Sequence, residues 1–153
     1  MRGIIVLHYW NTHTSLLESQ AINSAYKFLE VEDKHTPILS HMVQVEPLKD
    51  VMAKFKNHRS TKKNILEQEN ISVLLQWIQE NSLGDVKILG LHLNACVAQL
   101  TNRLQEASVL CGKRWENDLT VRIIKEATAG INIEQPVAIA DLLPDQRLSG
   151  LLE

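Results

Sequence analysis

The sequence predicts an α/β domain whose parallel sheet is covered by helices on both faces. Short runs of Ile, Val and Leu alternate along the chain with stretches of helical period, which is typical of βαβ units. The chain has 153 residues, of which 44% are hydrophobic and 22% charged, enough for one packed core. It contains no internal repeat, no low-complexity tract and no linker rich in Gly, Ser or Pro. We therefore expect a single domain over residues 1–153.

Four apolar runs predict buried strands. The continuous Ile, Val and Leu run over residues 3–7 is typical of a strand that is covered on both faces. These runs are residues 3–7, 38–43, 86–89 and 119–124. Residues 136–139 are the candidate for a fifth strand.

Three stretches between these runs have the apolar spacing of an amphipathic helix. The first contains Ile22, Ala25, Tyr26 and Leu29. The same spacing recurs over residues 71–78 and 97–107, and Gly112 is placed to cap the last helix. The basic stretch over residues 54–63 lacks this period, and we interpret it as a solvated loop.

This order of elements predicts a three-layer α/β/α fold. Crossovers between parallel strands are right-handed, so the strands form a doubly wound, mostly parallel sheet. Ligands of such sheets bind beyond the carboxyl ends of the strands. We therefore expect His8, the turn over residues 90–96 and the turn over residues 126–130 to surround one cleft.

Composition and charge exclude several classes of function. The formal net charge is −2 and the isoelectric point about 6.3, so we expect no nucleic-acid partner. No apolar run approaches the ~20 residues that cross a bilayer, and the first run is too short for a signal peptide. The two cysteines form no disulfide framework, which favours a cytoplasmic location. Glycine-rich phosphate-binding motifs do not occur, so we expect no nucleotide cofactor.

Cys96 is the candidate nucleophile. It stands at the start of the predicted helix that follows strand 86–89. The unpaired N–H groups at a helix N-terminus favour the thiolate over the thiol and can also stabilise an oxyanion. The alternative is that Cys96 is a small buried residue without a chemical role, as we expect for Cys111.

The segment around Cys96 resembles the isochorismatase-like cysteine hydrolases. In that family a strand leads to a glycine, and a Cys-Val pair follows six residues after it; here these are Gly90 and Cys96-Val97. The resemblance implies a catalytic lysine, for which Lys63 stands 33 residues before Cys96. Lysines 54, 56 and 62 are the alternatives. The family's first strand ends in a catalytic Asp, and His8 occupies that place here.

The resemblance implies hydrolysis of a small amide or related C–N substrate through a Cys96 thioester, without a cofactor. Lys63 would hold the thiolate, and His8 would serve as the acid–base group. Leu91 and His92 would contact the substrate beside backbone N–H groups that bind the oxyanion, and Trp10 would stack on it. The family's usual assembly implies a homo-oligomer.

Two other interpretations remain open, and a metal site is not expected. Because His8 replaces the expected Asp, the chain also fits a catalytically inactive binding or scaffold protein on the same fold. A nucleotide-binding domain is a weaker alternative, given the missing glycine motifs. His8, His13 and His41 do not have the spacing of a zinc motif, so we expect no metal.

Overall fold

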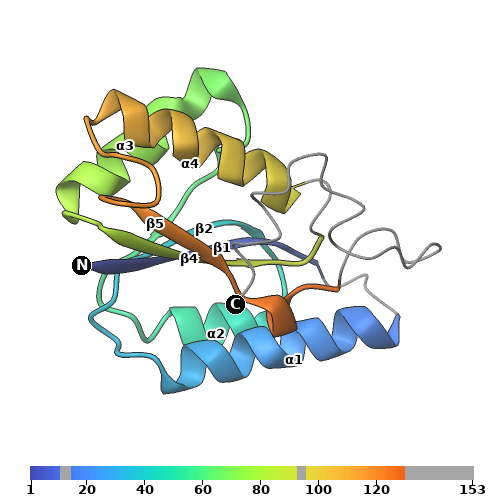
Figure 1. Ribbon diagram of the computed structural model, residues 1–153. Coiled ribbons are helices and arrows are strands. Elements are labelled where there is room, and N and C mark those ends of the chain that lie inside the picture. The colour runs from blue at the N-terminus through green and yellow to red at the C-terminus, as the bar shows by residue number, and fades with distance from the viewer. Residues whose placement is uncertain (11–14, 93–95, 130–153) are drawn as a thin grey trace.

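The computed structural model describes residues 1–10, 15–92 and 96–129, which form an all-parallel five-stranded sheet between layers of helices (Figure 1). The strands are β1 (Arg2–Tyr9), β2 (Ile38–Val43), β3 (His58–Ser60), β4 (Asp85–Gly90) and β5 (Thr120–Ile123). The helices are α1 (Leu16–Val31), α2 (Glu46–Met52), α3 (Ile71–Glu80) and α4 (Ala98–Leu110). Short 3-10 helices are η1 (Gln68–Asn70) and η3 (Lys125–Ala127).

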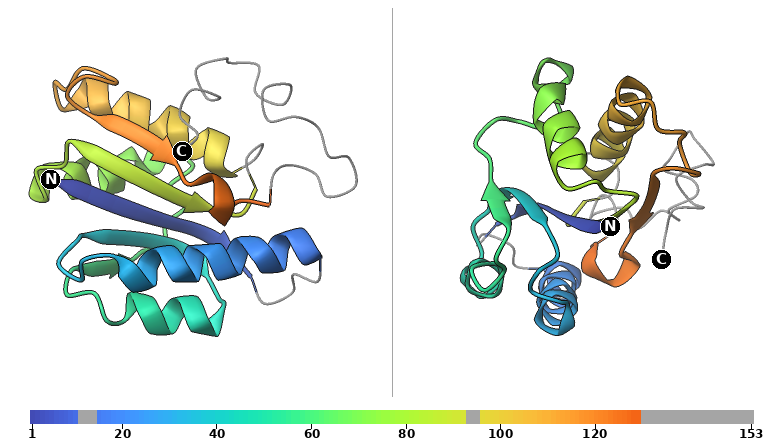
Figure 2. Two further views of the ribbon diagram at one scale, coloured as in Figure 1. Left: turned by 60° about the horizontal axis from the view of Figure 1, so that its bottom comes forward. Right: turned by 90° about the vertical axis from the view of Figure 1, so that its left-hand side faces the viewer.

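The strand order β3-β2-β1-β4-β5 confirms the predicted three-layer arrangement. From β1 the chain first moves outward through β2 to β3, with α1 and α2 packed on one face of the sheet. It then crosses to β4 and β5, with α3 and α4 on the opposite face (Figure 2). The direction of winding therefore changes between β1 and β4, which makes their carboxyl ends the switch point where ligands of such sheets bind.

The two faces of β1 explain its unbroken apolar sequence. Ile4 and Val6 pack in the core under α1 and α2, while Ile5 and Leu7 pack in the core under α3 and α4. All four side chains are fully buried. At about 25 cal/mol per Å² of apolar area, such burial is the main stabilising contribution to the fold.

Two left-handed residues reverse this alternation at the carboxyl ends of β1 and β2. His8 has φ 58° and Met42 has φ 55°. The strands pair on either side of both residues, Leu7 with His41 and Tyr9 with Val43. Leu7 packs under α3 and α4, whereas Tyr9 packs under α1 and α2. In a regular strand, residues two apart point to the same face of the sheet. The left-handed residues therefore switch the face to which the side chains at the end of each strand point.

We predict that Met42→Gly raises the free energy of unfolding by about 0.5–1 kcal/mol. Relief of the left-handed backbone gains about 1–2 kcal/mol, and the extra freedom of glycine in the unfolded chain costs about 0.5–1 kcal/mol. The Met42 side chain is exposed, so its loss costs little. Urea denaturation measures the change. Met42→Ala, which keeps the strained backbone, is the matched control and is expected to give no gain.

The predicted strands 3–7, 38–43, 86–89 and 119–124 all overlap observed strands, and each predicted helix is present. One strand and one α-helix of the described residues were not predicted. The interpretation of residues 54–63 as a solvated loop is wrong in its middle, because residues 58–60 form the edge strand β3. Helix α2 begins shortly after β2, with Pro47 in its first turn. The candidate strand 136–139 lies outside the described residues.

The helix α4 ends as its sequence predicts. Gly112 has φ 71°, and its N–H donates to the Val109 carbonyl at 3.1 Å while Lys113 N–H donates to the Ser108 carbonyl at 2.9 Å. This is the pattern of a glycine cap. In the part of the chain that the structure describes, no helix combines the length and the apolar character needed to cross a bilayer.

Candidate functional site

Three histidines gather where β1, β2 and β4 end. His8 is the last residue but one of β1, His41 lies near the end of β2, and His92 stands two residues after β4. The ring centroid of His8 lies 5.4 Å from that of His41 and 5.3 Å from that of Trp10. His92 is near enough to act electrostatically on His8. We call His8, His41 and His92 the histidine cluster; it occupies the switch point of the sheet.

The imidazole of His8 is neutral at physiological pH. Its pKa is lowered to about 4, first by burial and then by His41 and His92, each of which would repel a second positive charge. Its Nε2 atom is buried and has no hydrogen-bond partner among the described residues. A buried nitrogen without a partner costs roughly 1–3 kcal/mol. His8 thus combines a strained backbone and an unpaired polar atom, a combination typical of functional sites.

The backbone fixes the tautomer of His41. Its Nδ1 lies 2.8 Å from the carbonyl oxygen of Thr61, just beyond β3. A carbonyl oxygen only accepts, so Nδ1 carries the hydrogen and the Nε2 of neutral His41 is an acceptor. The ring is almost fully buried, so the hydrogen bond and the packing together hold its orientation.

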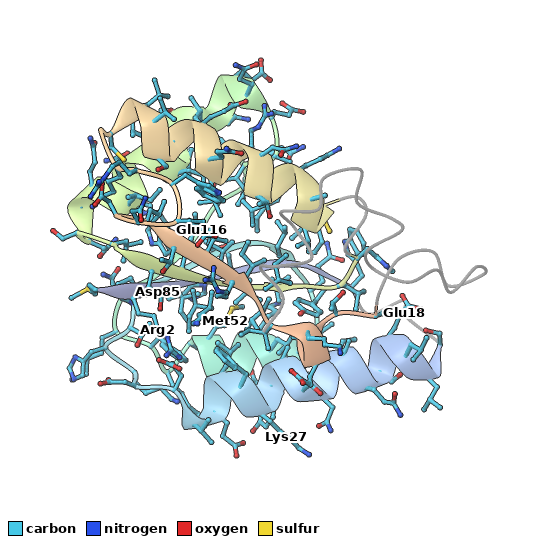
Figure 3. All side chains as sticks on the ribbon, in the orientation of Figure 1. Arg2, Glu18, Lys27, Met52, Asp85 and Glu116 are labelled. Atoms are coloured by element: carbon cyan, nitrogen blue, oxygen red, sulfur yellow. The ribbon has the colours of Figure 1, made fainter. Side chains whose placement is uncertain are left out.

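Glu18 adds a buried carboxylate to the site. Its Oε2 lies 3.7 Å from Nε2 of His92, and its side chain is only 6% exposed. Ser15 caps helix α1 by accepting from the Glu18 N–H, and its hydroxyl donates to Glu18 Oε1 at 2.7 Å. Figure 3 shows Glu18 at the N-terminal end of α1, the end toward which β1 points. Glu18 therefore places a buried carboxylate beside His92 at this end of the sheet.

Cys96 lies at the start of α4 but is not a poised thiolate. Its side chain is 4% exposed, and its thiol donates to the His92 carbonyl at 3.3 Å. Burial raises the pKa of the thiol, and the backbone hydrogen bonds around it offset this only in part. The stabilisation expected from the helix N-terminus is therefore outweighed by the loss of water.

We predict that Cys96 reacts with iodoacetamide more slowly than Cys111 at neutral pH. Cys96 is buried, whereas Cys111 is half-buried at the end of α4. Peptide mass spectrometry after timed labelling between about pH 6 and pH 10 gives both rates, and the Cys96 rate is expected to rise only above the ordinary thiol pKa of ~8.5. Fast labelling of Cys96 below that pH would contradict the prediction.

The remaining predicted site residues are placed as follows. Lys63 is exposed; its backbone N–H donates to Thr61 Oγ1, and its ammonium group makes no hydrogen bond or ion pair with the described residues. Leu91 is fully buried, and its carbonyl accepts from Ala129 N–H at 2.8 Å and from the Thr128 hydroxyl at 3.1 Å. These bonds hold residues 127–129 against the end of β4. His13 lies outside the described residues.

Sequence reasoning missed Glu18 and gave His41 no role except as a rejected metal ligand. Glu18 had a signal, because Ser15 and Glu18 form the S-x-x-E pattern of a helix start. Nothing in the sequence placed it beside His92. Within the described ranges, no group of three or more His, Cys, Asp or Glu side chains is arranged to hold a metal ion.

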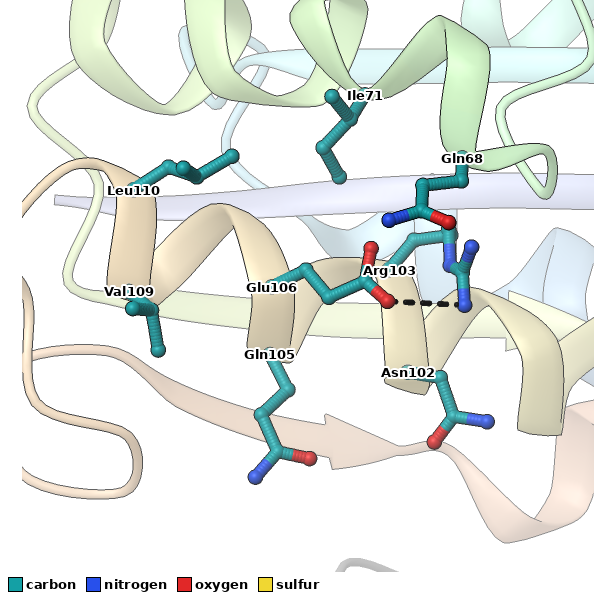
Figure 4. A pocket seen from close by; sticks show the side chains of 8 residues that line it. All are labelled: Gln68, Ile71, Asn102, Arg103, Gln105, Glu106, Val109 and Leu110. Carbon is teal, nitrogen blue, oxygen red and sulfur yellow. Dashed lines mark ion pairs between the residues drawn. The ribbon is translucent and has the colours of Figure 1, made fainter.

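A groove of about 620 Å³ lies at a different place, between η1, α3 and α4 (Figure 4). None of the predicted site residues lines it. Arg103 and Glu106 form an ion pair of 3.1 Å on its wall, and the exposed side chains of Val109 and Leu110 border it. The groove is therefore separate from the histidine cluster and shares no lining residue with it.

Comparison of the chain with protein-family models, with curated proteins and with solved structures finds no match.

Proposed function

We propose that this protein binds a small ligand at the histidine cluster. The observation that carries the proposal is the buried Nε2 of His8, which has no hydrogen-bond partner among the described residues and stands at the switch point of the sheet. A ligand atom that donates to or accepts from Nε2 would remove the cost of this unpaired atom.

The surroundings of His8 support binding of a ligand with a flat face. The rings of Trp10 and His41 lie beside His8, tilted to it by 46° and 49°. Aromatic rings in this arrangement offer apolar surface together with polar edges.

NMR of protein labelled with ¹⁵N in its histidines tests the proposal. Compounds from a panel of small aromatic amides, acids and amines are added near pH 7, and the ring nitrogens are observed. We expect at least one class to shift the signals of His8 and His41 and to lose its effect in the His8→Asn variant. Asn tolerates a left-handed backbone, so this variant keeps the strand end. Shifts confined to the exposed His35, or equal binding by His8→Asn, would overturn the proposal.

A cysteine hydrolase acting on a small amide or related C–N substrate is the second candidate. The observation that favours it is the position of Cys96 at the start of α4, after the strand next to β1. His8, being neutral, would accept the thiol proton; the sulfur would attack the carbonyl carbon; the amine would leave with a proton, and water would hydrolyse the thioester. Lys63 would stabilise the developing charge.

The labelling experiment on Cys96 and Cys111 separates the two candidates. The hydrolase requires Cys96 to become a thiolate near neutral pH, whereas ligand binding at the histidine cluster requires no reaction at sulfur. Cys96→Ala is expected to abolish hydrolysis under the second candidate and to leave binding unchanged under the first. The homo-oligomer implied by the resemblance stays a prediction, which light scattering on the purified protein would test.

A further inference from the structure

We infer that the ligand of the histidine cluster is a planar anion that binds together with one proton, taken up by the cluster from solvent. The inference rests on the proposed function, since it names the class of ligand for the same site.

The charged and titratable groups around His8 oppose a proton on its ring. The titratable groups that act on His8 in the described part of the chain are His41 on β2 and His92 after β4, and both oppose a positive charge on its ring. The buried carboxylate Glu18 lies against His92 at 3.7 Å and also accepts from Ser15. Among the described residues, a proton on His8 therefore lacks a counter-charge until an anion enters.

An anion bound at Nε2 of His8 would favour the protonated form of the ring. The unpaired nitrogen would carry the incoming proton and donate it to the anion as a charge-assisted hydrogen bond, which is about twice as strong as a neutral one. Any positive charge on His41 or His92 opposes a proton on His8 but attracts the same anion. A bound anion thus supplies the counter-charge that protonated His8 lacks among the described residues.

The rings beside His8 and two exposed lysines near His41 favour a flat anion. The tilted rings of Trp10 and His41 stand beside the imidazole of His8, where an aromatic ligand packs well. Lys62 and Lys63 are exposed and follow Thr61, whose carbonyl holds His41. These two cations attract an anion to this edge of the sheet over a distance of about a Debye length.

Benzoate and benzamide form the probe pair, since they share a ring and differ in charge. Calorimetric titration of the full chain near pH 7.5 and near pH 5.5 is expected to show benzoate binding about tenfold more tightly at the lower pH, because proton uptake adds up to tenfold per pH unit. Benzamide affinity is expected to change less than about twofold. Titration near pH 5.5 in two buffers of different ionisation enthalpy should show uptake of about one proton per benzoate.

Two variants give the controls. His8→Asn is expected to remove the pH dependence of benzoate binding, and His35→Asn, a substitution of an exposed histidine, to retain it. If both probes bind through His8 with no dependence on pH, the inference fails and the proposed function stands. If neither probe binds the wild-type chain more tightly than His8→Asn, both are overturned.

Discussion

Gly90→Ala is expected to lower the free energy of unfolding by about 2–3 kcal/mol, the range typical of an overpacked core. A Cβ atom at Gly90 would lie 2.4 Å from Cγ2 of Val97, well inside van der Waals contact. Gly90 is buried and Val97 fully buried, so neither the end of β4 nor the start of α4 can move without disturbing the core. Chemical denaturation of the variant measures the loss.

A double-mutant cycle identifies the contact as the cause. Val97→Ala alone is expected to cost about 1–3 kcal/mol through the cavity it leaves, and the double variant is expected to be more stable than the sum of the two changes predicts. Gly84→Ala is the matched control, because its Cβ would meet only the Asp118 carbonyl oxygen at 3.4 Å. An equal loss for Gly84→Ala and Gly90→Ala would contradict this explanation.

The close approach at Gly90 also positions the site. Val97 follows Cys96 directly, and its N–H donates to the His92 carbonyl at 3.3 Å. The same carbonyl accepts from the Cys96 thiol. Glycine at position 90 therefore allows α4 to begin close against β4, with Cys96 bonded to the segment that carries His92.

The free energy of unfolding is expected to fall by roughly 1–2 kcal/mol between about pH 7 and pH 4 because of His8. Its pKa is about 4 in the folded protein, against the ordinary histidine value of 6.5 that applies to the unfolded chain. Between these values the unfolded chain binds a proton that the folded chain does not. The contribution of neutral His8 is thus complete above about pH 6.5 and is lost as the pH falls toward 4.

A histidine pKa lowered from 6.5 to about 4 corresponds to about 3 kcal/mol, and the smaller figure expected here reflects partial exposure of the ring to solvent. Urea denaturation at several pH values measures the dependence. The His8→Asn variant is expected to reduce the pH dependence of the unfolding free energy in part. His58 contributes to the remaining dependence, because burial lowers its pKa as well. His35→Asn is the control and is expected to keep the wild-type slope. A His8→Asn slope as steep as the wild type would show that His8 titrates normally.

The sheet could be predicted from the sequence because its central strands are apolar on both faces. Burial under two helical layers leaves an unbroken run such as residues 3–7 in the sequence. The edge strand β3 has no apolar run in the sequence, because its residues are His58, Arg59 and Ser60. It forms through pairing with β2 and through the 2.7 Å hydrogen bond between Ser40 and His58, neither of which has a periodic signal.

The site could be predicted only in part. The position of His8, Cys96 and His92 at strand ends follows from the order of elements, and the structure places His8 and Trp10 side by side. The left-handed backbone at His8 and Met42 could not be predicted, because neither position is a glycine, the residue that usually signals this conformation. The burial of Cys96 depends on packing between α4 and the sheet, which a position at a helix start does not reveal.

Titration of the His8 ring by ¹⁵N NMR tests the central claim most directly. The account predicts that His8 is neutral down to about pH 5 and takes up its proton near pH 4, while addition of benzoate moves this titration toward neutral pH. The His8→Asn variant assigns the signal. A His8 ring that titrates near pH 6.5 in the folded protein, with or without benzoate, would contradict a partly buried, neutral imidazole at the switch point and the ligand site built on it.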